Sequence, residues 1–453
     1  MNQSATQSES HLARRLGLFD ATMIVMGGII GAGIFTNPYV VAQLVHTPVL
    51  ILGAWAAGGL IALAGGFIYA ELSSQVTESG GQYVYLREAM HPLVGFVYGW
   101  SLLFVIQTGG MAAVAIIFAN HLFELAGMAT SELNAALVGS AALAVLTIIN
   151  CIGVRAGTVT QNIFMILKLV AIAVLVVVGL TVNSSATNAA AAPAIASETV
   201  WQSMIAFGAA LIPTQFAYGG WQTACFVAGE VREPKKTLPR GLLLGVLGVV
   251  VVYLSVNFVC VHALGADGLA QTKTPATAVM RLAFGSRGGR LIAAGIAIST
   301  IGFLSQSMLT APRVYFAMAD DGLFFKQLAW LNRARVPAFA IALQGALAIV
   351  IALVASKYEQ ILNYVVSVDV VFFALSAVCV FVFRRNRAAA TDTFRIPGHP
   401  FTTLFFIGAC AVITFSLLYK FPLNSAISFG IMLLGVPAYF IWAKRRNAGA
   451  SRR

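Results

Sequence analysis

Apolar runs long enough to cross a lipid bilayer recur along the whole chain. An α-helix needs about 20 predominantly apolar residues to span the hydrocarbon core of a membrane, and irregular backbone is not stable in contact with lipid. We therefore expect an all-α polytopic membrane protein with twelve transmembrane helices, over residues 18–44, 48–75, 92–122, 133–152, 156–182, 201–228, 238–264, 288–319, 336–355, 359–383, 401–420 and 423–443.

The low number of charged residues agrees with a membrane protein, and their distribution predicts its orientation. Only 10% of the 453 residues are charged and 59% are apolar, which leaves too few charges to cover a soluble protein of this length. The net charge of +12 does not indicate a nucleic-acid partner, because most basic residues fall in loops on one side of the predicted spans, such as 232–240 and 384–395. Cytoplasmic loops are rich in Lys and Arg. We predict the cell (inner) membrane, with both termini cytoplasmic.

Four glycines interrupt the first apolar run, in Gly27-Gly-Ile-Ile-Gly-Ala-Gly-Ile-Phe35. Gly27 and Gly31 have the small-xxx-small spacing of close helix–helix packing, which is one interpretation. Glycine disfavours helix, and the sequence Gly31-Ala-Gly33 with Pro38 after it favours a break instead. A helix that restarts inside the membrane exposes backbone N–H groups at its positive end. Such an end can bind a carboxylate without a charged side chain.

The sixth apolar run repeats this interruption, with Pro213 and then Phe216-Ala-Tyr-Gly-Gly-Trp221. Paired interrupted segments indicate a transporter built from inverted repeats around a central site. A zwitterion would fit between N–H groups of one broken helix and C=O groups of the other. We predict the following order of parts: a disordered cytoplasmic tail over 1–13, a first repeat over 14–182, an outer loop over 183–200, a second repeat over 201–384, two further helices over 385–443 and a cytoplasmic tail over 444–453.

Six ordered motifs resemble those of the amino acid–polyamine–organocation permeases. They are Gly31-Ala-Gly-Ile-Phe35, Tyr69-Ala-Glu-Leu72 with Ser79-Gly-Gly-Gln-Tyr-Val-Tyr85, Gly95-Phe-Val-Tyr-Gly-Trp100, Phe216-Ala-Tyr-Gly-Gly-Trp221, Glu230-Val-Arg-Glu-Pro-Lys-Lys-Thr-Leu-Pro-Arg240 and Arg313-Val-Tyr-Phe-Ala-Met-Ala-Asp-Asp-Gly322. The fourth motif is most similar to that of the L-type amino-acid transporter light chains and their bacterial relatives. The resemblance implies the leucine-transporter fold, with a 5+5 inverted repeat and broken helices 1 and 6, and transport by alternating access.

The resemblance also implies how an amino acid would be bound. Backbone N–H groups would meet its carboxylate, backbone carbonyls would meet its α-amine, and one aromatic ring would close over it as a gate. The family usually has Ser where this chain has Ala32, so a hydroxyl contact would be lost while the backbone N–H remains. The residues implied are Gly31, Ala32 and Gly33 for the carboxylate, Ile29, Phe216, Ala217 and Gly219 for the α-amine, and Phe216 for the gate.

Lys168 lies in the middle of an apolar run, where a cation costs roughly 2.5–3.5 kcal/mol or more. Intramembrane charges usually mark functional sites. The resemblance implies that a lysine of helix 5 replaces a bound sodium ion and ties helix 1 to helix 8, near Ser305 or Ser307. A structural lysine that reaches an internal carbonyl is the alternative.

Other polar groups within the predicted spans allow two interpretations each. Asp369 is either a hydrogen-bonding anchor of helix 10 or a proton site. Gln107 and Thr108 of helix 3 either line the side-chain pocket or make polar contacts between helices.

The stretch over residues 79–92 is too apolar for a free loop and too short to span a membrane, which predicts a re-entrant or interfacial helix. Glu71 and Glu88 are most simply interfacial caps or ion-pair partners, with a proton relay as the alternative. By resemblance, Arg313 and Asp320 belong to the cytoplasmic closure of helix 8.

An enzyme or a channel explains these features less well than a carrier. The six histidines lie near span ends or in loops, and neither they nor the five cysteines have metal-ligand or disulfide-framework spacing. No metal and no cofactor is therefore expected. Two dissimilar broken helices do not make the repeated filter of a channel.

We accordingly expect a permease, not an enzyme, that exchanges neutral L-amino acids independently of sodium. A proton-coupled amino-acid symporter is the main alternative. A cationic amino-acid or polyamine antiporter comes third, because helix 6 has no carboxylate before Glu230. The segment 121–132 has no Cys, so no disulfide-linked heavy-chain subunit is expected, and the predicted partners are the substrate and the lipid bilayer.

Overall fold

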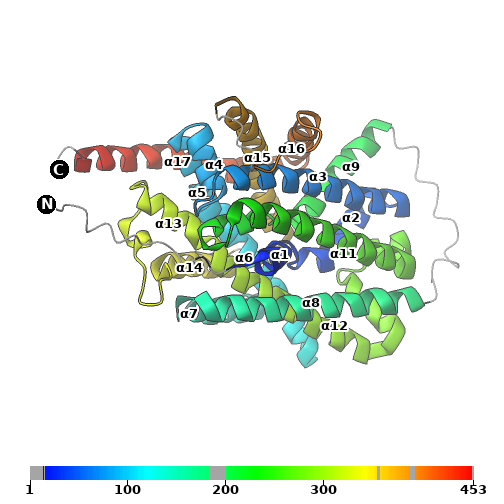
Figure 1. Ribbon diagram of the computed structural model, residues 1–453. Helices are drawn as coiled ribbons and strands as arrows, with labels where there is room; N and C mark the ends of the chain where they lie inside the picture. Colours follow the sequence, from blue (N-terminus) through cyan, green and yellow to red (C-terminus); the bar gives the residue numbers. More distant parts are fainter. Residues whose placement is uncertain are drawn as a thin grey trace.

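The computed structural model describes residues 14, 16–152, 154–182, 200–354, 358–386 and 393–450. Helices, packed lengthwise against one another, make up nearly all of this part of the chain (Figure 1). They are α1 (Leu18–Ile29), α2 (Gly33–Val45), α3 (Pro48–Gln75), α4 (Gln82–Ala89), α5 (Pro92–Ser101), the π-helix η1 (Leu102–Ile106), α6 (Gln107–Ala126), α7 (Glu132–Ile152), α8 (Val154–Thr181), α9 (Val200–Tyr218), α10 (Thr223–Phe226), the 3₁₀ helix η3 (Ala228–Glu230), α11 (Pro234–Gln271), α12 (Pro275–Thr310), α13 (Pro312–Asp320), the 3₁₀ helix η4 (Lys326–Ala329), α14 (Ala338–Val354), α15 (Tyr358–Asn386), α16 (Phe401–Lys420) and α17 (Pro422–Ala450).

The helices coincide with the apolar runs, because each run must form its own backbone hydrogen bonds. Helix α3 covers the predicted span 48–75 and α16 covers 401–420. Among the described residues, nine helices are long and apolar enough to cross a membrane, or ten when the bent pair α1–α2 counts as one span. Helix α14 is apolar but shorter. The chain is therefore a multi-pass helical membrane protein.

The first span is broken, as the glycine cluster predicted. Helix α1 ends at Ile29, α2 begins at Gly33, and the two helices are bent by 41°. The Ile30 N–H still donates to the Met26 carbonyl at 2.8 Å, and the Gly31 N–H then turns back to the Ile29 carbonyl at 2.9 Å. The break therefore releases the N–H groups that follow Gly31 from the helical pattern.

The sixth span is broken as well, and the two breaks touch. Helix α9 ends at Tyr218, and Gly220 follows with φ +119°, a conformation that favours glycine. A Cβ atom on Gly220 would lie 2.1 Å from the Gly28 carbonyl oxygen, and a Cβ on Gly28 would lie 2.8 Å from the Gly220 oxygen. The sequence offered a helix break or close packing through Gly27 and Gly31 as alternatives; the break occurs, and the close backbone contact is made by Gly28.

One end of the bundle contains α4, α13, the last turn of α3 and the first turn of α11, and we call it the α4–α13 end (Figure 1). The predicted interfacial segment 79–92 forms α4 there, with a buried stretch from Gln82 to Leu86. The Arg87 guanidinium of α4 donates to the Asp321 carboxylate just after α13. Asp320, which the resemblance implied for this closure, is the last residue of α13 and is exposed.

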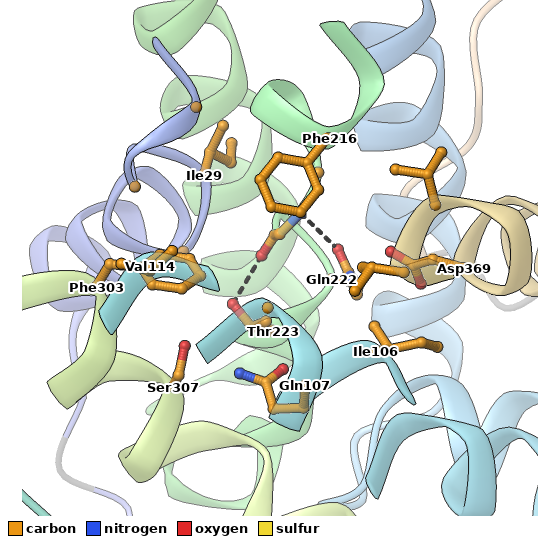
Figure 2. Close-up of a pocket in the computed structure, with 18 of the residues that line it drawn as sticks. Ile29, Ile106, Gln107, Val114, Phe216, Gln222, Thr223, Phe303, Ser307 and Asp369 are labelled. Carbon is orange, nitrogen blue, oxygen red and sulfur yellow. Dashed lines mark hydrogen bonds between the residues drawn. The ribbon is translucent and has the colours of Figure 1, made fainter. Parts of the chain in front are cut away.

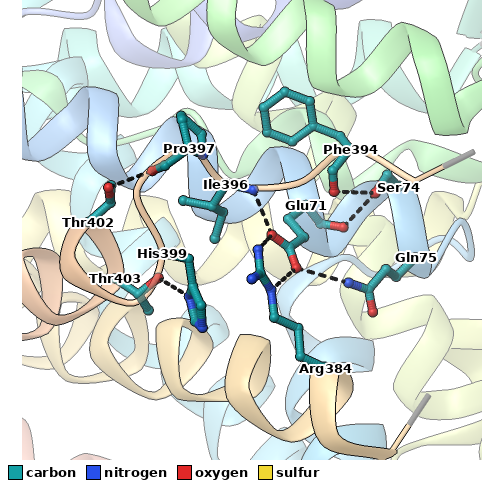
Figure 3. Close-up of polar contacts among 10 residues, drawn as sticks. All are labelled: Glu71, Ser74, Gln75, Arg384, Phe394, Ile396, Pro397, His399, Thr402 and Thr403. Atoms are coloured by element: carbon teal, nitrogen blue, oxygen red, sulfur yellow. Dashed lines mark hydrogen bonds and ion pairs between the residues drawn. The ribbon is translucent and has the colours of Figure 1, made fainter. Parts of the chain in front are cut away.

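A second ion pair at this end joins α3 to α15. The Arg384 guanidinium donates to both carboxylate oxygens of Glu71, at 2.7 and 2.6 Å, and the Ile396 backbone N–H donates to the same carboxylate at 2.8 Å (Figure 3). The prediction that Glu71 is an ion-pair partner is confirmed. Glu88 lies 3.5 Å from Arg87 and is also paired.

A third ion pair at this end is buried. The Arg313 Nε donates to Glu230 Oε1 at 3.0 Å, and the two side chains are 1% and 7% exposed. The backbone carbonyl of Glu230 accepts from the Leu16 N–H at 3.0 Å, and the Arg232 N–H donates to the Leu16 carbonyl at 2.9 Å. The segment before α1 is thereby attached to the segment after the second break.

Candidate substrate site

A pocket lies where the two broken spans meet, in the middle of the bundle (Figure 2). Helices α6, α12 and α15 complete its walls. Its lining is made of Gly28, Ile29, Gly31, Ala32, Gly33, Ile106, Gln107, Gly110, Val114, Gln215, Phe216, Gly219, Gly220, Gln222, Thr223, Phe303, Gln306, Ser307, Val365, Val366, Asp369, Val370 and Phe373.

Six of the seven residues predicted to bind substrate line this pocket, and they come from both breaks. Ala217 does not line it: it is buried, and its carbonyl accepts a hydrogen bond from the Tyr253 hydroxyl at 3.1 Å. The family resemblance implied Ala217 as one of the backbone carbonyls that meet the α-amine. The structure shows that the last turn of α9 directs the Ala217 carbonyl toward α11 instead.

The unpaired N–H groups at the first break are shifted by one residue from the prediction. Gly31 donates to the Ile29 carbonyl, whereas the N–H groups of Ala32, Gly33 and Ile34 have no acceptor among the described residues. These groups begin α2, where the helix dipole is positive. Because water or a ligand must satisfy such donors, the arrangement suits an anion beside Ala32 and Gly33.

Position 33 requires glycine because the backbones of the two breaks pack closely there. The need does not come from space that a ligand would occupy in the pocket. A Cβ atom on Gly33 would lie 2.9 Å from the Ala217 Cα. A larger residue would therefore push α2 away from α9. The effect on a bound carboxylate would come through this displacement, not through direct blocking.

Tyr253 is a site residue that the sequence reasoning missed. Its hydroxyl, from the middle of α11, lies 3.0 Å from the Ile29 carbonyl oxygen and 3.1 Å from that of Ala217. It thus bridges the ends of α1 and α9, behind the pocket. A tyrosine inside an apolar run carries no signal of such a role, because ordinary packing places tyrosines there too.

Lys168 reaches the first break from α8. Its side chain is 1% exposed, and its ammonium donates to the Ile30 carbonyl, which is the only hydrogen-bond partner of Nζ among the described residues. The expected contact with helix 8 is made by another residue: the Ser299 hydroxyl, from α12, lies 3.4 Å from the Gly31 carbonyl oxygen. Ser307 lines the pocket, and Ser305 is buried.

Polar side chains hold the second break in shape. The Gly220 N–H donates to Gln222 Oε1 at 3.0 Å, and the Thr223 hydroxyl donates to the Gly220 carbonyl at 2.7 Å (Figure 2). Gln306 of α12 donates to the Thr223 hydroxyl at 2.8 Å. The unwound segment is therefore fixed by its own side chains and by a neighbouring helix.

The structure places three polar groups for which the sequence allowed two interpretations each. Gln107 lines the pocket, whereas the Thr108 hydroxyl donates to the Leu103 carbonyl at 2.6 Å, inside the same span. Asp369 lines the pocket, and its Oδ1 is buried without a hydrogen-bond partner among the described residues. This oxygen therefore makes none of the hydrogen bonds that an anchoring role would use.

The described residues contain no group of three or more His, Cys, Asp or Glu that could hold a metal ion. The features that remain are a central pocket, two broken spans and polar groups that face inward. Together they define a membrane transporter with a binding site near the middle of its spans.

Comparison with known proteins identifies the family. Residues 16–442 match the family model described as amino acid permease, so the chain belongs to this family, within the amino acid–polyamine–organocation superfamily, and it is related to the L-type light chains. The members of this family are transporters, not enzymes.

Three relatives illustrate the family. The chain is 31% identical over 442 residues to the serine/threonine exchanger SteT of Bacillus subtilis (97% of this chain, 99% of the relative). It is 29% identical over 433 residues to the human large neutral amino acids transporter small subunit 2 (95% and 80%). It is 28% identical over 404 residues to the human b(0,+)-type amino acid transporter 1 (87% and 81%). These similarities support amino-acid transport as the function.

Proposed function

We propose that the protein exchanges neutral L-amino acids across the membrane, independently of sodium, by alternating access. The observation that carries the proposal is the pocket between the two breaks. Ala32 and Gly33, whose N–H groups lack acceptors among the described residues, line it from the start of α2. Ile29, Phe216 and Gly219 line it from the ends of α1 and α9, and we assign their carbonyls to the α-amine. A zwitterion complements this pair of poles.

The apolar part of the pocket receives the substrate side chain. Val114, Phe303 and Val365 lie in its walls, from α6, α12 and α15. Phe216 points into the pocket from the end of α9 (Figure 2), and we assign it the role of a gate that closes over bound substrate. An apolar wall favours neutral side chains, because a charge there would lose its hydration.

Lys168 supports independence from sodium. Its ammonium lies on the Ile30 carbonyl, at the break where a cation would otherwise stabilise the exposed carbonyl groups. A fixed cation at this position makes a bound sodium ion unnecessary. The contact between the first break and α12 is made by the Ser299 hydroxyl, rather than by Ser305 or Ser307.

The fold that we propose is the 5+5 inverted repeat with two helices added. When α9 and α14 are counted with the ten spans found by length and composition, twelve spans result. The α4–α13 end, which holds the ion pairs described above, then faces the cytoplasm, in the cell membrane. We propose no disulfide-linked heavy chain for this protein, because the residues between α6 and α7 include no Cys.

Proton-coupled symport is the second candidate, and one observation favours it. The buried carboxyl group of Asp369 lines the pocket, and its Oδ1 has no hydrogen-bond partner among the described residues. Intramembrane carboxyl groups can carry protons in transporters. The two candidates differ in what drives uptake.

Purified protein in liposomes tests the proposal. Radiolabelled alanine, serine and leucine are offered outside vesicles that contain unlabelled amino acid or none, with and without sodium and proton gradients. We expect uptake that requires internal amino acid and does not respond to either ion gradient. Uptake into empty vesicles that is driven by an inward proton gradient would replace the exchanger with a symporter.

The Lys168→Met variant tests the assignment of the cation. Methionine has similar length but leaves the Ile30 carbonyl without its charged donor, so we expect exchange to fall at least about tenfold, since a hydrogen bond to a charged group contributes about 1.5–3 kcal/mol. The exposed Lys235→Met on α11 is the control, with unchanged exchange. Normal exchange by Lys168→Met would refute the role of Lys168.

A further inference from the structure

Asp369 is a buried carboxyl group that the proposed binding of the α-carboxylate and α-amine does not use. Its residue is 9% exposed, it lines the pocket from the middle of α15, and its Oδ1 has no hydrogen-bond partner among the described residues. No Lys or Arg stands among the residues that line the pocket. The carboxyl group therefore faces the pocket without a basic partner in its lining.

The position of Asp369 within the pocket separates it from the first break. Figure 2 shows Ile29 and Phe303 on one side and Asp369 on the other, with the Phe216 ring between them. An amino acid held at Ala32 and Gly33 by its carboxylate would direct its side chain away from this break. A side chain long enough to cross the pocket would end at Asp369.

We propose that Asp369 is a specificity-determining residue, which selects amino acids whose side chain ends in an ammonium group, as in the α,ω-diamino acids. The inference rests on the proposed function for the α-carboxylate and α-amine, and it extends the range of side chains. The sequence argument against cationic substrates considered helix 6 alone. The structure supplies the missing carboxylate from α15 instead.

Beside the Asp369 carboxylate, electrostatics favours a substrate side chain that ends in an ammonium group over one that ends in a hydroxyl or a methyl group. A buried carboxylate without a partner is costly, and a cation that makes a direct hydrogen bond offsets this cost. A hydroxyl group offers a hydrogen bond but no charge, and the hydroxyl of serine is attached too close to its Cα to cross the pocket. A methyl group would leave the carboxylate desolvated and unpaired, so it is selected against.

Short neutral side chains remain compatible with this arrangement. They end among the apolar residues of the wall near the first break, such as Val114 and Phe303, on the side of the pocket away from Asp369 (Figure 2). The pocket therefore has two zones, an apolar one for short side chains and a carboxylate for the far end of long ones. Only the second zone predicts a preference for a long side chain that ends in an ammonium group.

Ornithine and norleucine test the second zone, because they differ only in a terminal ammonium and a terminal methyl group. The rise in melting temperature of the purified full-length protein measures their binding, so the test does not depend on transport. We expect ornithine to bind at least about tenfold more tightly than norleucine, a difference of about 1.4 kcal/mol. Tighter binding of norleucine would overturn the proposal.

The Asp369→Asn variant keeps the shape of the side chain and removes its charge. We expect it to lose the preference for ornithine: ornithine should bind at least about tenfold more weakly than it binds to the wild type, and norleucine should bind no more weakly. Ser367→Ala is the control on the same helix: it removes a hydrogen bond to the Tyr364 carbonyl, and Ser367 does not line the pocket. This control should keep the wild-type preference.

Exchange in liposomes then separates this inference from the proposed function. Leucine exchange by the wild type with no ornithine preference would overturn the inference and leave the proposed function standing. Binding of ornithine that depends on Asp369, without exchange of any amino acid, would support the inference and overturn the proposed function. If Asp369→Asn instead keeps its ornithine preference and only abolishes a response to the proton gradient, Asp369 is a proton site and the inference is wrong.

Discussion

At the breaks that form the pocket, main-chain N–H groups are left without acceptors among the described residues, whereas at the α4–α13 end charged side chains form ion pairs. Ala32 and Gly33 offer backbone N–H groups that lack acceptors among the described residues. Arg313 and Glu230 form a buried pair, and Arg384 binds Glu71 through two hydrogen bonds. The pocket keeps unpaired groups for a ligand, while the α4–α13 end satisfies its charges within the protein.

This difference determines which substitutions and which movements each region can accommodate. A main-chain site depends on close approach of the backbone, so it tolerates no added side-chain atom where the breaks touch. An ion-pair region can open by exchanging protein partners for water, because its charges are stable in water. Alternating access needs both properties, a shaped site and an end that opens. The following predictions test each side of the comparison.

The largest expected effect is on the buried ion pair. The Arg313→Met variant leaves the Glu230 carboxylate buried without its guanidinium partner, and loss of one member of a buried pair costs about 3–5 kcal/mol. We expect a marked fall in the melting temperature of the purified protein. The Arg281–Glu124 pair at the opposite end has a 2.8 Å contact but a 58% exposed Arg281 side chain, so Arg281→Met should cost only about 0–1 kcal/mol.

The double variant Arg313→Met/Glu230→Leu sharpens this prediction. It removes both charges, so no carboxylate is left unpaired, and apolar replacement of a buried pair is often neutral in stability. We expect the double variant to be more stable than Arg313→Met alone. Equal or greater destabilisation in the double variant would show that packing, not the unpaired charge, sets the cost.

The spans and the breaks could be predicted from the sequence, because both depend on the main chain. Apolar runs located the spans because lipid requires each one to be a continuous helix or a break lined by protein. Glycine clusters located both breaks, because glycine is the residue that permits close backbone contact. The bounds of α3 and the first break at Ile29 to Gly33 therefore followed from the residues alone.

The missed features depend on tertiary contacts that no local pattern encodes. The Tyr253 hydroxyl meets the carbonyls of Ile29 and Ala217 only because α11 packs beside both breaks. Asp369 faces the pocket only because of the rotation of α15. The carboxylate that pairs with Arg87 is that of Asp321, whereas the resemblance named only the adjacent Asp320 at this end. A shift of one residue on a helix turns a side chain by about 100°, which sequence reasoning did not resolve.

A methyl group at the contact between the two breaks should have the next largest effect. In Gly220→Ala, the φ of +119° would itself cost about 1–3 kcal/mol, and the new Cβ would lie 2.1 Å from the Gly28 carbonyl oxygen. We expect loss of substrate-induced stabilisation and of exchange. Gly408→Ala on α16 has open space around its Cβ and should behave as wild type. Normal exchange by Gly220→Ala would contradict the contact between the breaks.

Removal of the Tyr253 hydroxyl should have a smaller effect. Tyr253→Phe takes one donor from the carbonyls of Ile29 and Ala217, which lie 3.0 and 3.1 Å from it, and a single hydrogen bond contributes about 0.5–1.5 kcal/mol. We expect a lower melting temperature and weaker substrate binding. Tyr218→Phe is the control, because the Tyr218 hydroxyl is buried without a partner among the described residues. Similar effects of both variants would argue against a bridge at Tyr253.

The smallest expected effect concerns pH at the α4–α13 end. Burial lowers the pKa of His399 below its usual value of 6.5, and the nearby Arg384 guanidinium lowers this pKa further. The neutral imidazole is thus favoured in the folded state, so its contribution is complete above about pH 6.5 and is lost as pH falls through the lowered pKa. His399→Gln should slightly reduce the fall in melting temperature between neutral and mildly acidic pH. Thr403→Val keeps the imidazole but removes the hydroxyl 3.0 Å from its Nδ1, so it should retain the wild-type pH dependence. An unaltered profile in His399→Gln would show that the ion pairs alone govern the response of this end to acid.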